Sequence, residues 1–494
     1  MQKIVDIHSH MFNLKYLPVA GILKRHKIPH FIAKGVESLL LRHTKESYPL
    51  AGIQGILKYK DDEDNTSVTV YIDDWEPIDY GMDEIADLSD DEIANAITQF
   101  AVVGDLKSGD LSVAIDEYEK QELRSGDFFM IVDYEDDEAL KRHRAGLLQR
   151  MINKVIRIIN AAVNYGKWFL FMTNSEKDIY KYIEQKDEPG VVAYLHLMMD
   201  VDRFLNEDPD TEDEDLLYRS RFNFATQQVQ NMKKLNDDFP KLIGFVAFNP
   251  ARKNWLEIIE NARANGFKGV KFYPPLGYKA SGGPYADRIK ALFAHCQTHN
   301  IPVFTHCNNQ GFEAWPLSGY NSNPVFWEEA LAKYPNLILC LGHAGGGHGW
   351  FAKNDPSTDI TDPDLILAAN IKNEKAAQMA NWNNSYAAMV YKLCVKYDNV
   401  YCDASYLDEI IDDYGNMDDD AKKLFTKRLK KLFEVSPKFA ERIMYGSDWH
   451  MLFQEGKNRV YLKRYIELFD QPELAPYKDA FFYGNAEKYL RRNF

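Results

Sequence analysis

The chain has 494 residues, of which 45% are hydrophobic, and a formal net charge of -15 at pH 7. This length suffices for one large domain with an insertion, or for two or three domains. The acidic balance argues against non-specific nucleic-acid binding and against attachment to anionic lipid, because both favour basic patches. No apolar run reaches the ~18 residues that a membrane span needs, and no signal peptide fits before a strand that begins at residue 4. We therefore expect a soluble, cytoplasmic protein.

The cysteines favour the same compartment. Their number is odd, and none of them forms a Cys-x-x-Cys pair. Several lie within apolar runs, which is typical of buried, reduced thiols in a reducing compartment. They are Cys296, Cys307, Cys340, Cys394 and Cys402.

The segment 4–10 begins the series of predicted strands. Its short β-branched run alternates apolar and polar residues, which predicts a strand, and it ends in His8 and His10. Because side chains alternate along a strand, this i, i+2 spacing directs both imidazoles to one face. Two neutral imidazoles at a strand end form half of a divalent-metal site. A His-x-His pair can equally arise by chance, so the rest of the chain has to decide between the two interpretations.

Residues 11–189 carry no convincing series of strands. Segments such as 147–159 place apolar residues at helical spacing, and acidic, loop-like clusters separate these segments. We predict a mostly helical insertion after the first strand, which could form a cap over the active site.

From residue 190 the pattern changes to strands that alternate with helices, such as the helix predicted over 255–264. Together with the first strand there are eight predicted strands, and apolar strands followed by helices imply a parallel sheet covered by helices. Eight such units predict an α/β fold, the (β/α)₈ TIM barrel, built from residues 1–10 and 190–494. A final helix over 485–492 would pack underneath or beside it. The seven later strands are predicted at 191–200, 242–250, 269–275, 301–307, 337–343, 399–403 and 442–448.

Seven of the eight predicted strands end in a polar residue that can bind a metal or transfer a proton. In a TIM barrel the carboxyl ends of all strands meet on one face, where barrel enzymes hold their active sites. Each residue also has a simpler interpretation: Asp200 and Asp403 could cap the helices that follow them, which we favour for Asp403, and Lys271 could be a surface lysine. The simpler interpretations do not explain the joint pattern. It comprises His8, His10, Asp200, Lys271, His306, His343, Asp403 and Asp448.

The sequence resembles the amidohydrolase superfamily of metal-dependent TIM-barrel enzymes. More narrowly, it resembles the amidohydrolase-related (amidohydrolase 2) branch, which contains hydrolases, hydratases and aminocarboxymuconate-semialdehyde-type decarboxylases. The likeness covers residues 1–10 and about 190–494, and leaves the insertion outside. It rests on the segments Asp6-Ile7-His8-Ser9-His10, Pro302-Val303-Phe304-Thr305-His306-Cys307, Gly342-His343-Ala344-Gly345-Gly346, Tyr445-Gly446-Ser447-Asp448 and Gly484-Asn485-Ala486.

The resemblance implies that His8, His10, His306 and Asp448 bind one divalent ion. It places His343 beside the ion, where this residue either polarises the substrate or binds a second metal. Three imidazoles and a carboxylate suit Zn²⁺, with Mn²⁺ or Fe²⁺ as alternatives. Such an ion lowers the pKa of a bound water to ~7. Asp448 could take the proton of that water and pass it to the leaving group, while His343 stabilises the charge that grows on the attacked oxygen.

Lys271 decides between one metal ion and two. Its segment Gly-Val-Lys-Phe-Tyr-Pro is similar to the strand that carries a carboxylated, metal-bridging lysine in binuclear members such as dihydroorotases. A lysine in a dry, metal-rich site could lose its proton and take up CO₂, because burial lowers the pKa of lysine. In the related branch the same position often contacts substrate as a cation instead. We favour one ion per chain, and two if Lys271 is carboxylated.

Four further residues are candidates for substrate contact: Asp200, Tyr273, Trp449 and His450. Trp449 and His450 follow Asp448, where the branch often has an aromatic residue and a proline. The glycine-rich segment 345–350 follows a strand of the site, and its glycines would let the backbone approach a ligand closely.

Three hypotheses for the function follow. The first is a metal-dependent hydrolase whose activated water cleaves a C–N or C–O bond of a small molecule, such as an amide, a cyclic amide or a lactone. The second is a non-oxidative decarboxylase or hydratase that acts on an unsaturated or aromatic carboxylic acid, with His343 or Asp448 protonating carbon. The third is a binding protein with a degenerate barrel, which the complete ligand set disfavours. We expect no nucleic-acid or membrane partner. The oligomeric state is open, although dimers are common in this branch.

Overall fold

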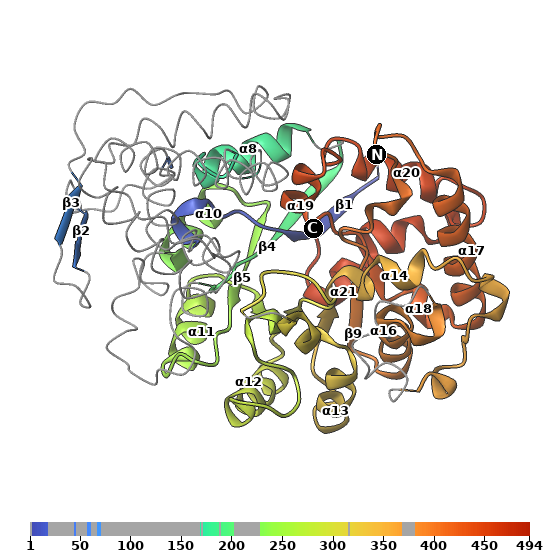
Figure 1. Ribbon diagram of the computed structural model, residues 1–494, viewed down its shortest axis with the longest axis horizontal. Coiled ribbons are helices and arrows are strands. Elements are labelled where there is room, and N and C mark those ends of the chain that lie inside the picture. The colour runs from blue at the N-terminus through green and yellow to red at the C-terminus, as the bar shows by residue number, and fades with distance from the viewer. Residues whose placement is uncertain are drawn as a thin grey trace, which may run out of the picture.

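The computed structural model describes residues 2–17, 44–45, 57–60, 67–70, 168, 171–186, 189–201, 228–314, 317–367 and 381–494. Eight of its strands form one sheet in the order β1-β4-β5-β6-β7-β8-β9-β10, and every neighbouring pair along this order is parallel. All eight strands that the sequence predicts are confirmed (Figure 1). They span Ile4–Ser9 (β1), Val191–Leu197 (β4), Leu242–Ala247 (β5), Gly269–Phe272 (β6), Val303–Thr305 (β7), Leu339–Leu341 (β8), Val400–Asp403 (β9) and Ile443–Met444 (β10).

The first and last strands of this order lie side by side and close the barrel. The backbone N–H of Ile7 donates to the carbonyl oxygen of Tyr445 at 3.3 Å, and that of Asp448 donates to the carbonyl oxygen of His8 at 2.7 Å. The side chain of Asp6, on β1, accepts hydrogen bonds from the backbone N–H and the hydroxyl group of Ser447, which follows β10. The (β/α)₈ TIM barrel that the sequence predicts is therefore the fold of the protein.

The interior of the barrel is filled by every second residue of the strands. On β1 these are Val5 and Ile7, and on β4 they include Leu195 and Leu197, all of them buried. This alternation follows from the two-residue period of a strand, which turns the intervening side chains toward the surrounding helices. His196 lies between the inward-facing Leu195 and Leu197, so its side chain is on the outer face of β4.

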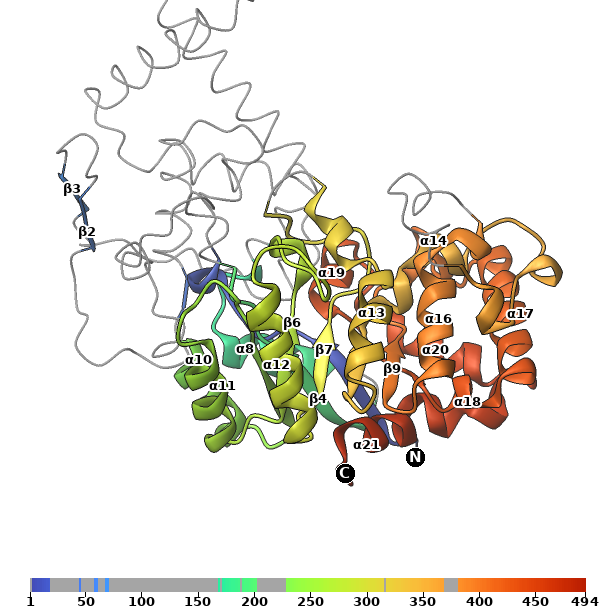
Figure 2. The ribbon, with the colours of Figure 1, turned by 90° about the horizontal axis from the view of Figure 1, so that it is seen from below.

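Helices surround the strands on the outside, and Figure 2 shows α11, α12 and α13 side by side along the barrel wall. The helix predicted to end before Gly266 is α11. The longest helix, α17, starts at a side-chain cap: the Asp418 carboxylate accepts from the N–H of Ala421. The helices span Glu176–Lys186 (α8), Val229–Asp238 (α10), Trp255–Ala264 (α11), Ala286–Thr298 (α12), Val325–Lys333 (α13), Gly347–Trp350 (α14), Tyr386–Lys396 (α16), Asp419–Val435 (α17), Pro437–Ala440 (α18), Trp449–Gln454 (α19), Tyr461–Phe469 (α20) and Asn485–Leu490 (α21).

The last helix, α21, closes the end of the barrel opposite the carboxyl ends of the strands. Ala486 and Tyr489 belong to the same buried cluster as the inward residues of the strands, and the hydroxyl group of Tyr489 donates to the carbonyl oxygen of Val303 at 3.1 Å. The predicted position of the final helix underneath the barrel is confirmed (Figure 2).

Part of the insertion predicted over 11–189 is described. Helix α8 lies at its end, while the helical segment 147–159 and the proposed cap over the site lie outside the described residues. Two short antiparallel strands, Leu57–Lys60 (β2) and Ser67–Val70 (β3), were not predicted. Each strand has four residues, and a run this short carries too few periods to be recognised by alternation.

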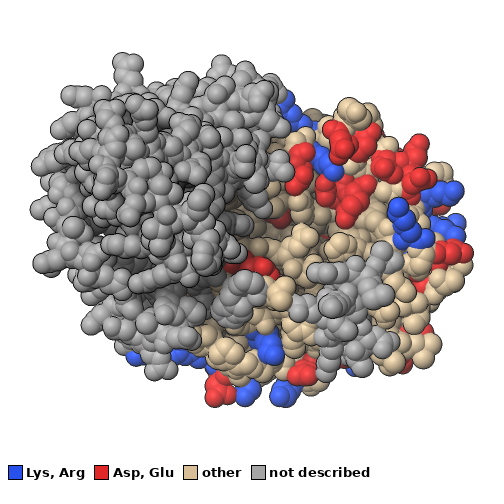
Figure 3. Space-filling model, viewed as in Figure 1, with Lys and Arg blue, Asp and Glu red and all other residues tan. Residues whose placement is uncertain are grey.

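The burial of the cysteines and the charge of the surface agree with what the amino-acid composition indicates. All five cysteines are free and buried, as predicted. None of the described helices is long and apolar enough to cross a membrane. On the face shown in Figure 3, acidic side chains are more numerous than basic ones above α19 and α20.

We predict that Gly269→Ala destabilises the barrel wall. A Cβ atom at this first residue of β6 would lie 2.4 Å from the ring of Phe245 and 2.5 Å from the backbone oxygen of Pro302, so β5, β6 and β7 would have to separate. Such overpacking costs about 1–3 kcal/mol, which urea denaturation would measure. Gly484→Ala is the matched control, because its nearest atom is 3.7 Å away and its φ is -62°, and it should not lower stability. Equal midpoints for the two variants would contradict the packing described here.

Candidate metal centre

Four histidines and one aspartate from four strands converge at the carboxyl end of the barrel. They are the predicted residues His8, His10, His306, His343 and Asp448, and all are buried. His8, His343 and Asp448 each offer a ligand atom within 4.8 Å of the others. His10 Nε2 lies 3.7 Å from Asp448 Oδ1, and His306 Nδ1 lies 3.0 Å from His343 Nε2. The structure therefore brings together every residue of the predicted ligand set, and His343 with them.

The backbone at two of these residues adopts the left-handed conformation. His343 has φ 61° and Asp448 has φ 53°, which are uncommon for residues with a side chain. Such strain tends to occur at functional sites, where the surrounding structure maintains it. A glycine also allows β10 to approach β1 closely, because a Cβ atom at Gly446 would lie 2.8 Å from the Cβ of His8.

Hydrogen bonds outside the cluster fix the tautomers of His10 and His306. The Nδ1 atom of His10 lies 2.7 Å from the carbonyl oxygen of Leu197, and Nε2 of His306 lies 2.6 Å from the carbonyl oxygen of Gln310. A carbonyl oxygen can only accept, so each of these nitrogens carries a hydrogen. In the neutral imidazole the other nitrogen then presents a lone pair. These lone pairs, on His10 Nε2 and His306 Nδ1, face Asp448 and His343.

His343 and His8 follow the same rule. Nδ1 of His343 lies 3.3 Å from the carbonyl oxygen of Ser405, and Nδ1 of His8 lies 3.3 Å from Asp403 Oδ2. We assign the hydrogen of each ring to Nδ1 on these contacts, and Nε2 of each ring is then left with a lone pair. As a result, lone pairs on His343 Nε2 and His306 Nδ1 oppose each other at 3.0 Å. This contact is repulsive unless a cation lies between the rings, so the donor set fits a bound metal ion.

Burial determines the charge state of these groups. It holds the pKa of His8, His10 and His343 well below the usual value and lowers that of His306 to about 3, so all four imidazoles are neutral at pH 7. Neutral imidazole is the form that binds metals. Burial also raises the pKa of Asp448 to about 7, which the charge of Lys271 opposes. A divalent cation would favour the ionised carboxylate still more.

Lys271 contributes a buried amino group to the same region. Its side chain is 1% exposed, and Nζ has no hydrogen-bond partner among the residues that the structure describes. Nζ lies 4.6 Å from the centre of the Phe304 ring and 5.7 Å from that of Tyr273. Burial lowers the pKa of Lys271 to about 8, while the carboxylates of Asp448 and Asp403 oppose this shift. Lys271 is therefore not a surface lysine, and its role in the site stays a prediction.

Two of the predicted substrate contacts lie next to the cluster. The Tyr273 ring is 4.9 Å from the His306 ring between centres, and its hydroxyl group accepts from the N–H of Phe312 at 2.8 Å. His450 is buried with its ring centre 6.4 Å from that of His10. Their contact with substrate stays a prediction.

Two other predicted contacts are engaged elsewhere. Both carboxylate oxygens of Asp200 accept from the guanidinium group of Arg252, at 2.5 and 2.7 Å. The Trp449 ring packs in an aromatic group outside the cluster, with Phe171 at 5.2 Å and Phe453 at 5.3 Å between centres. The left-handed turn at Asp448 directly precedes α19, and this turn carries Trp449 away from the histidines. The structure does not bring Asp200 or Trp449 together with the metal-binding residues.

The interpretation of Asp403 as a helix cap is wrong. No helix follows it directly, and its Oδ1 accepts from the backbone N–H groups of Ser405, at 2.8 Å, and His343, at 3.2 Å. Ser405 was not predicted from the sequence. This residue lies two positions beyond the end of β9, where a lone serine gives no signal in the sequence.

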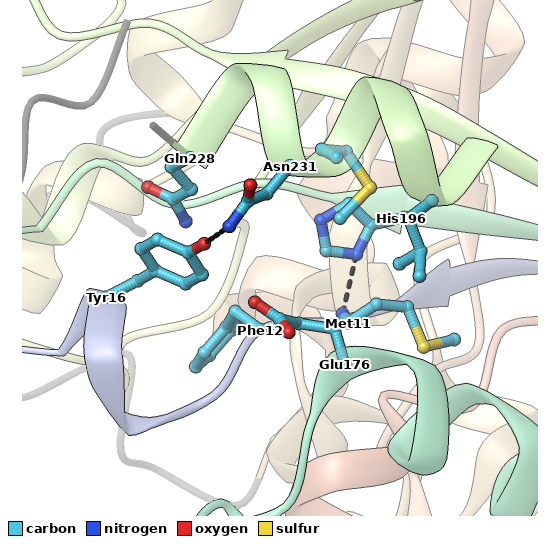
Figure 4. Close-up of a pocket in the computed structure, with 9 residues that line it drawn as sticks. Met11, Phe12, Tyr16, Glu176, His196, Gln228 and Asn231 are labelled. Carbon is cyan, nitrogen blue, oxygen red and sulfur yellow. Dashed lines mark hydrogen bonds between the residues drawn. The ribbon is translucent and has the colours of Figure 1, made fainter. Parts of the chain in front are cut away.

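A small pocket lies on the outer side of β4, apart from the cluster (Figure 4). His196 Nδ1 accepts from the N–H of Met11 at 2.6 Å there, and Glu176 and Asn231 are among the polar side chains that line it. His196 was not predicted from the sequence as a residue that lines a pocket. Its position between two inward leucines is the signal that it faces away from the barrel interior.

The family comparison concerns the part of the barrel around β4–β8. A family model described as Amidohydrolase (Amidohydro_2) matches residues 177–356. None of the curated proteins matches the chain.

Among solved structures, three TIM-barrel or amidohydrolase proteins illustrate the likeness. An uncharacterized TIM-barrel protein from Bordetella bronchiseptica is 13% identical, covers 64% of this chain and 82% of its own, and has a TM-score of 0.37. An amidohydrolase from Burkholderia multivorans with bound zinc is 12% identical over 64% and 88%, with a TM-score of 0.39. A putative 2-pyrone-4,6-dicarboxylic acid hydrolase from Pseudomonas putida is 15% identical over 63% and 87%, with a TM-score of 0.35.

We predict that Asp200→Ala weakens the fold and leaves metal binding intact. The variant leaves Arg252 without its carboxylate partner, and breaking a buried ion pair from one side costs about 3 kcal/mol. Thermal or urea unfolding would measure the loss. Asp287→Ala, which removes an exposed carboxylate paired with Lys290, is the control and should change stability by less than about 0.5 kcal/mol. An Asp200→Ala variant of normal stability that no longer binds substrate would restore the substrate role.

Proposed function

We propose that this chain is a metal-dependent hydrolase of the amidohydrolase superfamily, whose family model matches residues 177–356, and that it cleaves a C–N or C–O bond of a small molecule. An amide, a cyclic amide or a lactone is the proposed substrate class. One observation carries the proposal: each of four buried imidazoles donates a hydrogen bond away from the centre and turns its other nitrogen toward the cluster around Asp448.

The proposed ligands of one divalent ion are His8, His10, His306 and Asp448. Zinc is the preferred ion, since neutral imidazoles and a carboxylate are its usual nitrogen and oxygen ligands, and Mn²⁺ or Fe²⁺ are alternatives. When bound, the ion would supply Lewis-acid chemistry and lower the pKa of a water molecule to ~7. The proximity of His343 to His8 and Asp448 adds it to the ligands available to the ion.

The side chains around the ion would move the protons. Asp448 is the carboxylate that belongs to the ligand group, and we assign it the proton of the attacking water, which it passes to the leaving group. For His343 to stabilise the attacked oxygen, its hydrogen would have to be on Nε2. The contacts of Nδ1 favour the other tautomer. We therefore assign His343 to the metal side of the site and give the charge-stabilising role to the ammonium group of Lys271.

Lys271 also supports a second candidate, a non-oxidative decarboxylase or hydratase of an unsaturated or aromatic carboxylic acid. A buried cation is costly unless an anion accompanies it. Within the described part of the chain no acceptor is hydrogen-bonded to Lys271 Nζ, so a substrate carboxylate would complete the site. A carbamate formed on Lys271 would do the same and would bring a second metal ion.

We expect metal analysis of purified protein to give about one transition-metal ion per chain, largely lost in His8→Ala. The variant removes one lone pair from the centre, and elemental analysis after dialysis against metal-free buffer would measure the effect. His299→Ala replaces an exposed histidine that directly follows α12 and should keep the metal. A content near two metal ions per chain would indicate that Lys271 is also a ligand. If the wild-type protein contains no metal, the proposed function is contradicted.

We predict that Lys271→Met separates the two candidates. If Lys271 binds a substrate carboxylate, the variant should raise KM for carboxylated substrates by about 10-fold or more, because one charge-assisted hydrogen bond contributes about 1.5–3 kcal/mol. Neutral amides and lactones should instead lose kcat, if Lys271 stabilises the attacked oxygen. The measurement is a steady-state screen of lactones, dipeptide-like amides and hydroxybenzoates. Lys290→Met, an exposed lysine on the same barrel wall, is the control and should leave both constants unchanged.

A further inference from the structure

Ser405 lies between two histidines of the metal centre. It is fully buried, two residues beyond the end of β9. Its Oγ atom is 2.7 Å from Nδ1 of His8 and 3.0 Å from Nδ1 of His343. These histidines come from β1 and from the end of β8, so one hydroxyl group connects three strands at the carboxyl end of the barrel.

Asp403 holds this hydroxyl group in place. Its Oδ1 atom accepts from the backbone N–H of Ser405 at 2.8 Å, and its Oδ2 atom lies 3.3 Å from Nδ1 of His8. Asp403 is fully buried, so these contacts are shielded from water.

The hydrogen-bonding capacity of a hydroxyl group matches these partners. A serine hydroxyl has one hydrogen to donate and two lone pairs to accept with. If its hydrogen goes to the Asp403 carboxylate, which can only accept, both lone pairs are available to the N–H groups of His8 and His343. Each ring then carries its hydrogen on Nδ1, and the hydroxyl group and both N–H groups all have a partner.

We propose that Ser405, oriented by Asp403, is a positioning residue that holds His8 and His343 together in the Nδ1–H tautomer and so directs both Nε2 atoms to the metal. The proposal rests on the metal centre of the proposed function for its purpose. It does not require a particular substrate or reaction. Ser405 acts through the two imidazoles, as partners behind metal-binding histidines do in general, where they fix the tautomer and the ring orientation.

The tautomers can be measured in the metal-free wild-type protein. With ¹⁵N-labelled histidine, long-range ¹H–¹⁵N correlation spectra distinguish protonated from unprotonated ring nitrogens, and His8→Ala and His343→Ala assign the signals. We expect both residues to be protonated on Nδ1. An Nε2–H signal for either one in the wild-type protein would overturn the proposal, whether or not the protein binds metal.

A serine variant then tests the consequence for the metal. Ser405→Ala should give mixed tautomers at His8 and His343 and weaken zinc binding by about 10- to 100-fold, as competition with a chromogenic chelator would measure. The catalytic loss should fall on kcat and spare KM. Ser322→Ala is the matched control, since Ser322 is equally buried and its hydroxyl group has no hydrogen-bond partner in the part of the chain described here.

The outcomes separate this proposal from the proposed function. If Ser405→Ala keeps both the tautomers and the zinc affinity of the wild type, the positioning role is wrong although the metal centre stands. If the wild-type protein binds no metal but shows both Nδ1–H tautomers, the positioning role stands and the hydrolase proposal fails. If Ser405→Ala does not fold, the wild-type spectra alone still decide the tautomers.

Discussion

The carboxylate of Asp6 reinforces the junction at which the barrel closes. It accepts from the backbone N–H of His8 at 3.0 Å and from the backbone N–H of Ser447 at 2.9 Å, and it also binds the hydroxyl group of Ser447. These contacts join the first strand to the last one across 441 positions of sequence. Burial alone would disfavour the charged carboxylate and raises its pKa to about 6, while the hydrogen bonds stabilise the ionised form. Together with the backbone hydrogen bond from Asp448 to His8, this junction holds the histidines of β1 beside Asp448.

The electrostatics of the centre follow from that closure. Four neutral imidazoles present lone pairs to one small volume, and two of these lone pairs oppose each other at 3.0 Å. A protein interior tolerates such an arrangement poorly, because buried polar atoms need partners. The left-handed backbone at His343 and Asp448 adds a further cost. A divalent cation at this position would offset both costs at once, which is why the donor set and the strain support the same interpretation.

Much of this site could be predicted from the sequence because of the geometry of parallel strands. The eight strands were identified by their apolar runs, and each strand's last residue had to reach the same face, so His306 and Asp448 could be placed together without coordinates. The roles of Asp403 and Ser405 could not be predicted in this way. They depend on how a loop turns after β9, and the sequence contains no periodic signal for that turn. The position of Trp449 could not be predicted for a similar reason, because the backbone conformation of Asp448 sets the direction in which α19 begins.

The family comparison and the geometry support the metal centre from different residues. The matched segment 177–356 contains Lys271, His306 and His343, but it excludes both histidines of β1 and the aspartate after β10. Those three residues enter the cluster only because the barrel closes next to the matched half. The contact of 3.7 Å between His10 Nε2 and Asp448 Oδ1, and the grouping of His8 and Asp448 with His343, are therefore evidence that the family match does not contain. The closed barrel, and not the family match, is what brings the residues outside the matched segment together with those inside it.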